Sequence, residues 1–179
     1  MDAEFVKIKQ KNLTLYIRKS FLGSDLGQAL LSGEETLRKK YPFKTLAPSE
    51  FSRVCKFNIP LEGADRDIYI KWFFRKSGLA SLKSLICGSL AKCTYNAEKM
   101  LAQNGFDVPV TIAVGESWSG PFHSESFSVT LGIENTKRAF DIIRHVREIT
   151  TSEQLAGFRD LIRNFGLTIG KMHANGIFH

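Results

Sequence analysis

The sequence predicts a mixed α+β fold, in which an antiparallel sheet with one long helix is followed by a second long helix. Short segments that alternate apolar and polar residues between turn residues are typical of antiparallel strands. Two longer segments place apolar residues at spacings of three and four, which is typical of amphipathic helices. The composition agrees, because 43% hydrophobic and 24% charged residues are normal for a globular domain.

Six segments are predicted strands, because they combine alternation with β-branched and aromatic residues. In chain order they are Phe5–Gln10, Leu13–Arg18, Ser52–Ile59, Ile68–Phe74, Val108–Glu116 and Ser126–Ile133. Lys11-Asn12 separates the first two, and a polar turn over residues 60–67 that contains Gly63 separates the next two. Each of these pairs is therefore expected to form a hairpin, and the last two strands a further antiparallel pair.

Three segments are predicted helices. A short one is expected to open near Ser32 and to end before Pro42. A long one is expected over residues 80–104, although Gly88 weakens its middle and two helices are the alternative. The strongest is Ser152–Asn175, with Ser152 as its N-cap. Its continuous apolar stripe consists of Leu155, Phe158, Leu161, Ile162, Phe165, Ile169 and Met172.

Charge and cysteine content narrow the function classes. The formal net charge of +7 favours an anionic partner such as a nucleotide, a phosphorylated glycolipid, an acidic membrane or a nucleic acid, with a merely solvated basic face as the alternative. No stretch approaches about 18 consecutive apolar residues and the N-terminus does not read as a signal peptide, so a cytoplasmic protein is expected. Cys55, Cys87 and Cys93 lack CxxC spacing, which favours reduced thiols over a disulfide framework or a zinc site.

Lys71 is the first candidate for a functional residue. It ends the run Ile-Tyr-Ile-Lys, which matches the Val-Ala-Ile-Lys strand whose lysine holds the α- and β-phosphates of the nucleotide in kinases. A compact ammonium with several donors suits phosphate oxygens, although a surface lysine at a strand end is the alternative. Glu98 is the only acidic residue of the long helix predicted over 80–104, so it is the candidate partner of Lys71, with a solvated glutamate as the alternative.

The last residues, Met172 to His179, read MHANGIFH. In many small-molecule and lipopolysaccharide kinases a helix ends in Leu-His-x-x-Gly-Ile-x-His, followed by Gly-Asp-Leu. The chain therefore resembles the lipopolysaccharide core kinases, which phosphorylate Kdo or heptose. A core histidine at His173 and a flexible tail at His179 are the alternatives. A second run from Leu82 to Pro109 is similar to the Leu-Lys, Ala-Arg, Leu, Gly-Ile-x-x-Pro pattern of these kinases.

The resemblance covers residues 52–179 and implies a protein-kinase-like N-terminal lobe. Residues 1–50 would be an N-terminal extension with a hairpin and a short helix, 51–134 the lobe, and 135–179 the hinge connector and first helix of a C-terminal lobe. Hinge backbone groups bind adenine in this family, which makes Leu131, Gly132 and Ile133 candidates for that contact. The chain departs from the family in two ways. Thr94 occupies the usual position of the helix glutamate, and there is no GxGxxG loop, so a turn near Pro48–Arg53 would cover the phosphates.

The implied activity is ATP-dependent phosphoryl transfer to a lipopolysaccharide core sugar, with ATP and Mg²⁺ as cofactors and an anionic glycolipid as acceptor at the inner face of the inner membrane. His179 would begin the catalytic loop. The catalytic aspartate and the metal ligands are expected beyond it, so this chain alone is expected to be an inactive fragment. The alternative is a non-catalytic nucleotide- or partner-binding half-kinase that forms an oligomer through the apolar stripe of its last helix. A nucleic-acid-binding protein is the weakest reading.

Overall fold

The computed structural model describes residues 4–74, 88–119, 122–134, 136, 139–144 and 151–177. The chain divides into two compact units, Met1–Ile133 and Glu134–His179.

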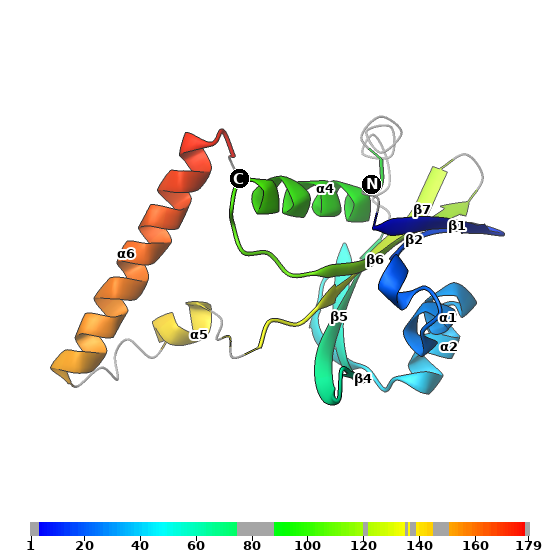
Figure 1. Cartoon of the computed structure of the whole chain (residues 1–179), viewed down its shortest axis with the longest axis horizontal. Coiled ribbons are helices and arrows are strands. Elements are labelled where there is room, and N and C mark those ends of the chain that lie inside the picture. Colours follow the sequence, from blue (N-terminus) through cyan, green and yellow to red (C-terminus); the bar gives the residue numbers. More distant parts are fainter. Residues whose placement is uncertain are drawn as a thin grey trace. The chain divides into compact units, whose positions relative to one another are not determined.

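The first unit is built on an antiparallel sheet, which Figure 1 shows with helices on both of its faces. Over the described residues the sheet has seven strands in the order β1-β2-β6-β7-β5-β4-β3, and each neighbouring pair is antiparallel. The strands are β1 (Phe5–Gln10), β2 (Leu13–Arg18), β3 (Lys44–Pro48), β4 (Ser52–Leu61), β5 (Ala64–Phe74), β6 (Thr111–Ser119) and β7 (Phe122–Leu131). The predicted α+β class and antiparallel sheet are confirmed, whereas a kinase-like lobe stays a prediction.

Two hairpins fix the register of the sheet. The β1–β2 hairpin has the predicted bounds around Lys11-Asn12, and β2 also pairs with β6, so this hairpin is part of the main sheet. The β4–β5 hairpin is longer than predicted, because Glu62 and Gly63 have φ values of 54° and 82° and turn the chain within two residues. Positive φ at both central positions matches the twist of paired strands, so pairing continues up to the turn. The wide turn predicted over residues 60–67 was therefore wrong.

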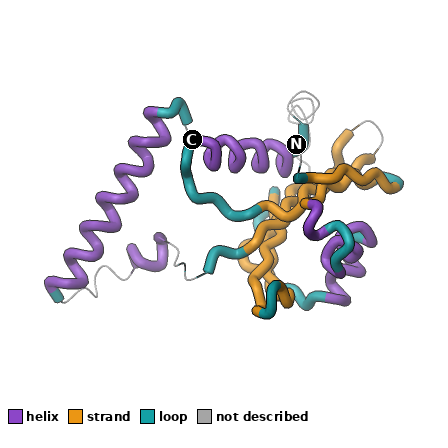
Figure 2. The backbone as a smooth tube through the Cα atoms, viewed as in Figure 1, coloured by secondary structure: helices purple, strands orange, loops and turns teal. Residues whose placement is uncertain are grey.

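Two short helices cover one face of the sheet, α1 (Asp25–Ser32) and α2 (Glu34–Lys40) (Figure 2). Ser24 caps α1 by accepting a hydrogen bond from the Gly27 N–H at 3.1 Å. The short predicted helix corresponds to α2, but Gly33 rather than Ser32 precedes it, and α1 was missed. Beneath these helices lies the main core, whose most buried large side chains include Leu15, Ile17, Leu26, Leu37, Ile68 and Ile70.

The opposite face carries α4 (Leu90–Gln103), which packs against β6, β7 and β5. Ser89 is its N-cap, with a side chain that accepts from the Lys92 N–H at 3.2 Å, and Gly88 has a φ of 78°. A residue in the left-handed region followed by a capping serine is a helix start, so the described helix begins at Leu90. The part of the predicted helix over residues 80–87 lies outside the described residues.

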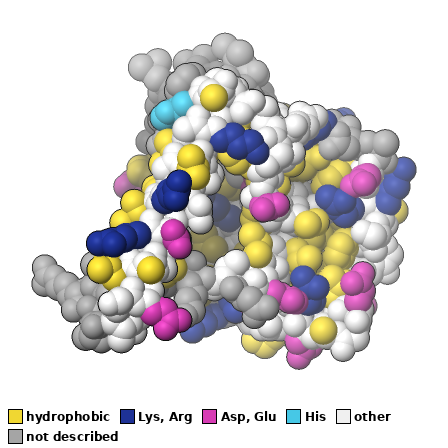
Figure 3. Space-filling view, turned by 60° about the vertical axis from the view of Figure 1, so that its left-hand side comes forward, with side chains coloured by type: hydrophobic (Ala, Val, Ile, Leu, Met, Phe, Trp, Pro, Cys, Tyr) yellow, Lys and Arg dark blue, Asp and Glu magenta, His cyan; other side chains and the backbone are white. Residues whose placement is uncertain are grey.

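The second unit contains α5 (Ala139–Arg144) and α6 (Ser152–Ala174). Helix α6 matches its prediction closely, although its N-cap is Thr151, which forms a capping box with Gln154. None of the α6 residues is buried, and Leu155, Ile162, Phe165 and Leu167 are exposed. Figure 3 shows hydrophobic side chains exposed among basic ones along this helix. Among the described helices none is long and apolar enough to cross a membrane.

Candidate functional site

Lys71 lies on the face of the sheet that α4 covers. Along β5, Ile70 and Trp72 belong to the core beneath α1 and α2, whereas Phe73 packs with Ala91 of α4. Since successive strand residues point to opposite faces, Lys71 shares the side of Phe73. Its Nζ lies 4.9 Å from the centroid of the Phe73 ring. Within the described part of the chain, no carboxylate is within ion-pair distance of this ammonium.

Glu98 faces the same side of the sheet, but it contacts the start of β6. Its Oε2 accepts a hydrogen bond from the Thr111 hydroxyl at 2.6 Å. Burial raises the pKa of the Glu98 carboxyl, and the bond from Thr111 opposes that rise in part. Thr111 belongs to the cross-strand row of Tyr69, whereas Lys71 pairs with Ser128 in a neighbouring row. The described residues therefore contain no ion pair between Glu98 and Lys71.

Thr94 offers no charge to Lys71. It occupies the position at which the kinases that the chain resembles usually have the helix glutamate. Its hydroxyl donates to the carbonyl oxygen of Leu90 at 2.9 Å, one turn earlier in α4. This is the local back-bonding that threonine adopts within helices.

The acidic residue that sequence reasoning missed is Glu116 of β6, which is only 4% exposed. Its Oε1 accepts a hydrogen bond of 2.6 Å from Ser89, the N-cap of α4. One signal was present in the sequence. Val114 and Glu116 alternate with Ala113 and Gly115, so an apolar Val114 facing inward places the carboxylate on the inner face too.

Glu116 belongs to a band of buried polar side chains at the N-terminal end of α4. The band consists of Thr14, Ser89, Glu116, Ser126 and Ser128. Cross-strand pairing places Thr14, Glu116 and Ser126 in one row and Ser128 beside Lys71 in the next. The Ser126 hydroxyl also accepts from the Ala91 N–H at 3.3 Å, which attaches the first turn of α4 to β7. Hydroxyls and a carboxylate therefore lie on the side of the sheet that carries Lys71.

The three candidate adenine-binding residues follow β7 directly. The N–H of Leu131 donates to the backbone carbonyl oxygen of Val110 at 2.9 Å, and the N–H of Gly132 donates to the backbone carbonyl oxygen of Asp67 at 2.7 Å. A Cβ at Gly132 would lie 2.7 Å from the Cβ of Asp67, so glycine is required for this close approach. Ile133 is 55% exposed and ends the first unit. The N–H groups of Leu131 and Gly132 are thus already used within the sheet.

The turn proposed to cover phosphates connects β3 to β4. It is closed by Ser49, whose N–H and hydroxyl both donate to the carbonyl oxygen of Ser52, at 2.8 and 3.1 Å. Arg53 follows on the face opposite to Lys71, where its guanidinium pairs with Glu34 at 2.5 Å and lies 4.7 Å from the Trp72 ring centroid. Arg53 therefore does not face the side on which Lys71 lies.

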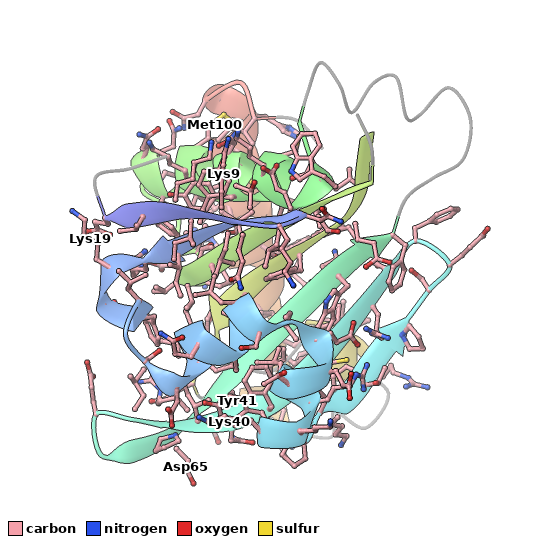
Figure 4. All side chains as sticks on the ribbon, turned by 90° about the vertical axis from the view of Figure 1, so that its right-hand side faces the viewer. Lys9, Lys19, Lys40, Tyr41, Asp65 and Met100 are labelled. Atoms are coloured by element: carbon pink, nitrogen blue, oxygen red, sulfur yellow. The ribbon has the colours of Figure 1, made fainter. Side chains whose placement is uncertain are left out.

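A pocket of about 390 Å³ lies on the α1 and α2 side of the sheet. Figure 4 views the molecule from that side, with Lys40 and Tyr41 near the end of α2. Trp72 and Phe127 line the pocket, together with Leu30 and Leu37, and charged residues at its edge include Lys11, Glu34 and Glu125. Phe127 can lie against the sheet here because its strand partner is Gly115, where a Cβ would be 2.1 Å from the ring. Sequence reasoning did not identify this pocket.

His179 lies outside the described residues. No group of three or more His, Cys, Asp or Glu that could hold a metal occurs among those that are described. Neither Cys55 nor Cys93 forms a disulfide with another described residue. Cys87 also falls outside the described ranges.

Comparison of the chain with protein-family models, with curated proteins and with solved structures finds no match. The resemblance to lipopolysaccharide core kinases therefore rests on the residues of this chain alone.

Proposed function

We propose that the chain is the nucleotide-binding part of an ATP-dependent phosphotransferase that acts on a sugar of the lipopolysaccharide core. The observation that carries the proposal is the position of Lys71. Its ammonium has no carboxylate partner among the described residues and lies on the sheet face beside α4. An ammonium held on a strand suits the α- and β-phosphates of a nucleotide, because it supplies a fixed positive charge with several donors.

The order of elements supports the same reading. The described chain runs β4, β5, α4, β6, β7 and then leaves the sheet at Leu131, with Lys71 on β5 directly before the segment that leads to α4. Mg²⁺ would neutralise the phosphates of the bound nucleotide. The acceptor we propose is an anionic glycolipid at the inner face of the inner membrane, and the net charge of +7 favours both this acceptor and the nucleotide.

The test is thermal unfolding of the chain with and without Mg·ATP. At a hundredfold excess over the dissociation constant, binding should raise the Tm by about 5–10 °C. Lys71→Ala should abolish that shift. Lys56→Ala is the matched control, because Lys56 lies on the neighbouring strand and its ammonium is paired with Asp67 at 2.6 Å. No shift in the unmutated chain, or an equal shift in Lys71→Ala, would refute nucleotide binding through Lys71.

A second candidate function is a partner-binding half-kinase without turnover. The exposed apolar side chains of α6 favour it, because a row of exposed leucine, isoleucine and phenylalanine residues is costly in water. A second copy of the chain is the simplest partner. Light scattering across a range of protein concentrations would then report a dimer that Phe165→Glu dissociates, whereas a monomer at all concentrations would exclude self-association through α6.

A further inference from the structure

The buried carboxylate of Glu116 needs a counter-ion. Among the described residues its only bonded partner is the Ser89 hydroxyl, and no lysine or arginine lies within ion-pair distance. A buried carboxylate with a single neutral hydrogen bond is strongly unfavourable, since burial removes the water that stabilises its charge. A cation that reaches this carboxylate would therefore gain a large electrostatic stabilisation.

Most of the cations on this face are already engaged. Lys7 and Lys92 lie 5.5 and 5.7 Å from the ring centroid of Tyr16. Lys56 is paired with Asp67. Among the residues that the structure describes, two lysines remain within reach through the sheet register, Lys71 on β5 and Lys9 on β1.

The register places Lys71 within reach of Glu116. Strands β5 and β6 flank β7, and the two residues are offset by two positions along the strands. Strand spacing and rise put their Cα atoms about 12 Å apart, a gap that the two extended side chains can bridge. The Lys71 ammonium already leans toward Phe73, which shares a cross-strand row with Ser126 and Glu116. Ser126 and Ser128 belong to β7, the strand between the two residues.

Lys9 is the competing cation. It reaches the row of Glu116 from the other side, through Thr14. Lys9 is exposed on the edge strand β1 (labelled in Figure 4), whereas Lys71 is half-buried. An exposed lysine gains little from an ion pair, because solvent screens the charge and the ordered side chain loses entropy.

We propose that Glu116, rather than the helix residue Glu98, is the acid that positions the Lys71 ammonium. Glu98 is hydrogen-bonded to Thr111, which shares a cross-strand row with Tyr69, two residues before Lys71. Glu116 instead shares the row of Phe73, two residues after Lys71. A strand carboxylate attached to the N-cap of α4 would hold Lys71 and the start of that helix together. The consequence for nucleotide binding rests on the proposed function, whereas the ion pair itself does not.

The test is a double-mutant cycle on the full chain. Glu116→Gln removes the charge and keeps an oxygen that can accept from Ser89. Mg·ATP affinity measured by calorimetry should fall about tenfold in Glu116→Gln, as expected for loss of a charged partner. Because loss of Lys71 is itself expected to abolish nucleotide binding, the coupling between Lys71→Met and Glu116→Gln is measured as a non-additive effect on the urea unfolding equilibrium. Glu98→Gln is the matched control, because it keeps an acceptor for Thr111, and it should change the affinity by less than about twofold.

Three results would overturn the assignment. The first is a tenfold loss of Mg·ATP affinity in Glu98→Gln, and the second is an equal loss of affinity in Ser89→Ala and in Glu116→Gln. The third is energetic coupling of Glu116→Gln to Lys9→Met instead of to Lys71→Met. If the unmutated chain binds no Mg·ATP, the proposed function fails and the pairing is decided by unfolding in urea without nucleotide. Non-additive effects of Lys71→Met and Glu116→Gln on the unfolding equilibrium constant, by about tenfold, would support the pair. Additive effects would refute it.

Discussion

Gly115→Ala is the substitution whose effect on stability follows most directly from the geometry. Gly115 lies in β6 between Leu15 of β2 and Phe127 of β7. A Cβ at this position would be 2.1 Å from Cε1 and 2.2 Å from Cζ of the Phe127 ring. Carbon atoms in good contact are about 3.5 Å apart, so the ring would have to move by at least about 1.4 Å.

The cost depends on where the ring can go. Overpacking a well-filled core costs about 1–3 kcal/mol. Phe127 is half-buried and lines the pocket beneath α1 and α2, so its ring can swing partly into that space. We therefore expect Gly115→Ala to lower the free energy of unfolding by about 2 kcal/mol.

Urea unfolding followed by tryptophan fluorescence measures this change, and Trp72 beside Phe127 in the pocket is a local reporter. Gly23→Ala is the matched control, because nothing lies within 4 Å of a Cβ there, and it should alter stability by less than about 0.5 kcal/mol. Phe127→Ala should cost less in the Gly115→Ala background than alone, since it removes the clash. A Gly115→Ala variant as stable as the control, or strictly additive effects, would refute the reasoning.

Two further predictions concern α4. Burial raises the pKa of Glu98 in the folded chain above its unfolded value of 4.5, so the protonated carboxyl favours folding. This stabilisation is complete below pH 4.5 and is lost as the pH rises through the folded pKa. Compared with Glu98→Gln, the unmutated chain should therefore lose unfolding free energy from about pH 4 toward pH 7, and parallel pH profiles would contradict this. Ser89→Ala removes an N-cap and a hydrogen bond to Glu116, so calorimetric unfolding should show a loss of about 2–3 kcal/mol, against about 1 kcal/mol for the cap Ser24→Ala. Equal losses in the two variants would show that the bond to Glu116 adds nothing.

Local sequence signals predicted the parts of the fold that local chemistry determines. The β1–β2 hairpin and α6 have nearly the predicted bounds, because alternation and a continuous apolar stripe each extend over the whole element. The sequence misplaces the turn at Glu62-Gly63, because a proline such as Pro60 normally ends a strand. Proline is tolerated there because β3 pairs with β4 only as far as Lys56, which leaves one side of Pro60 without a neighbouring strand.

The candidate site was predicted only in part, for a similar reason. The pattern Ile-Tyr-Ile-Lys predicts a strand, which β5 confirms, whereas the role of Lys71 stays a prediction. The position of Glu116 relative to Lys71 depends on β6 and β7 lying next to β5, which is a property of the sheet and not of any segment. Glu98 is the candidate from sequence as the only acid of the helix predicted over residues 80–104, but its contact with Thr111 depends on where β6 begins.

The order of strands also constrains when this sheet can form. The hairpin of β1 and β2 is the first element of the chain, yet its neighbour in the sheet is β6, with Thr14 opposite Glu116. Pairing across about a hundred residues raises the contact order and slows folding. During synthesis the hairpin must therefore wait, with one long edge unpaired, until β6 has been made. The exposed Lys9 lies instead on β1, which stays an edge strand in the finished sheet, and a lysine there hinders pairing with other chains.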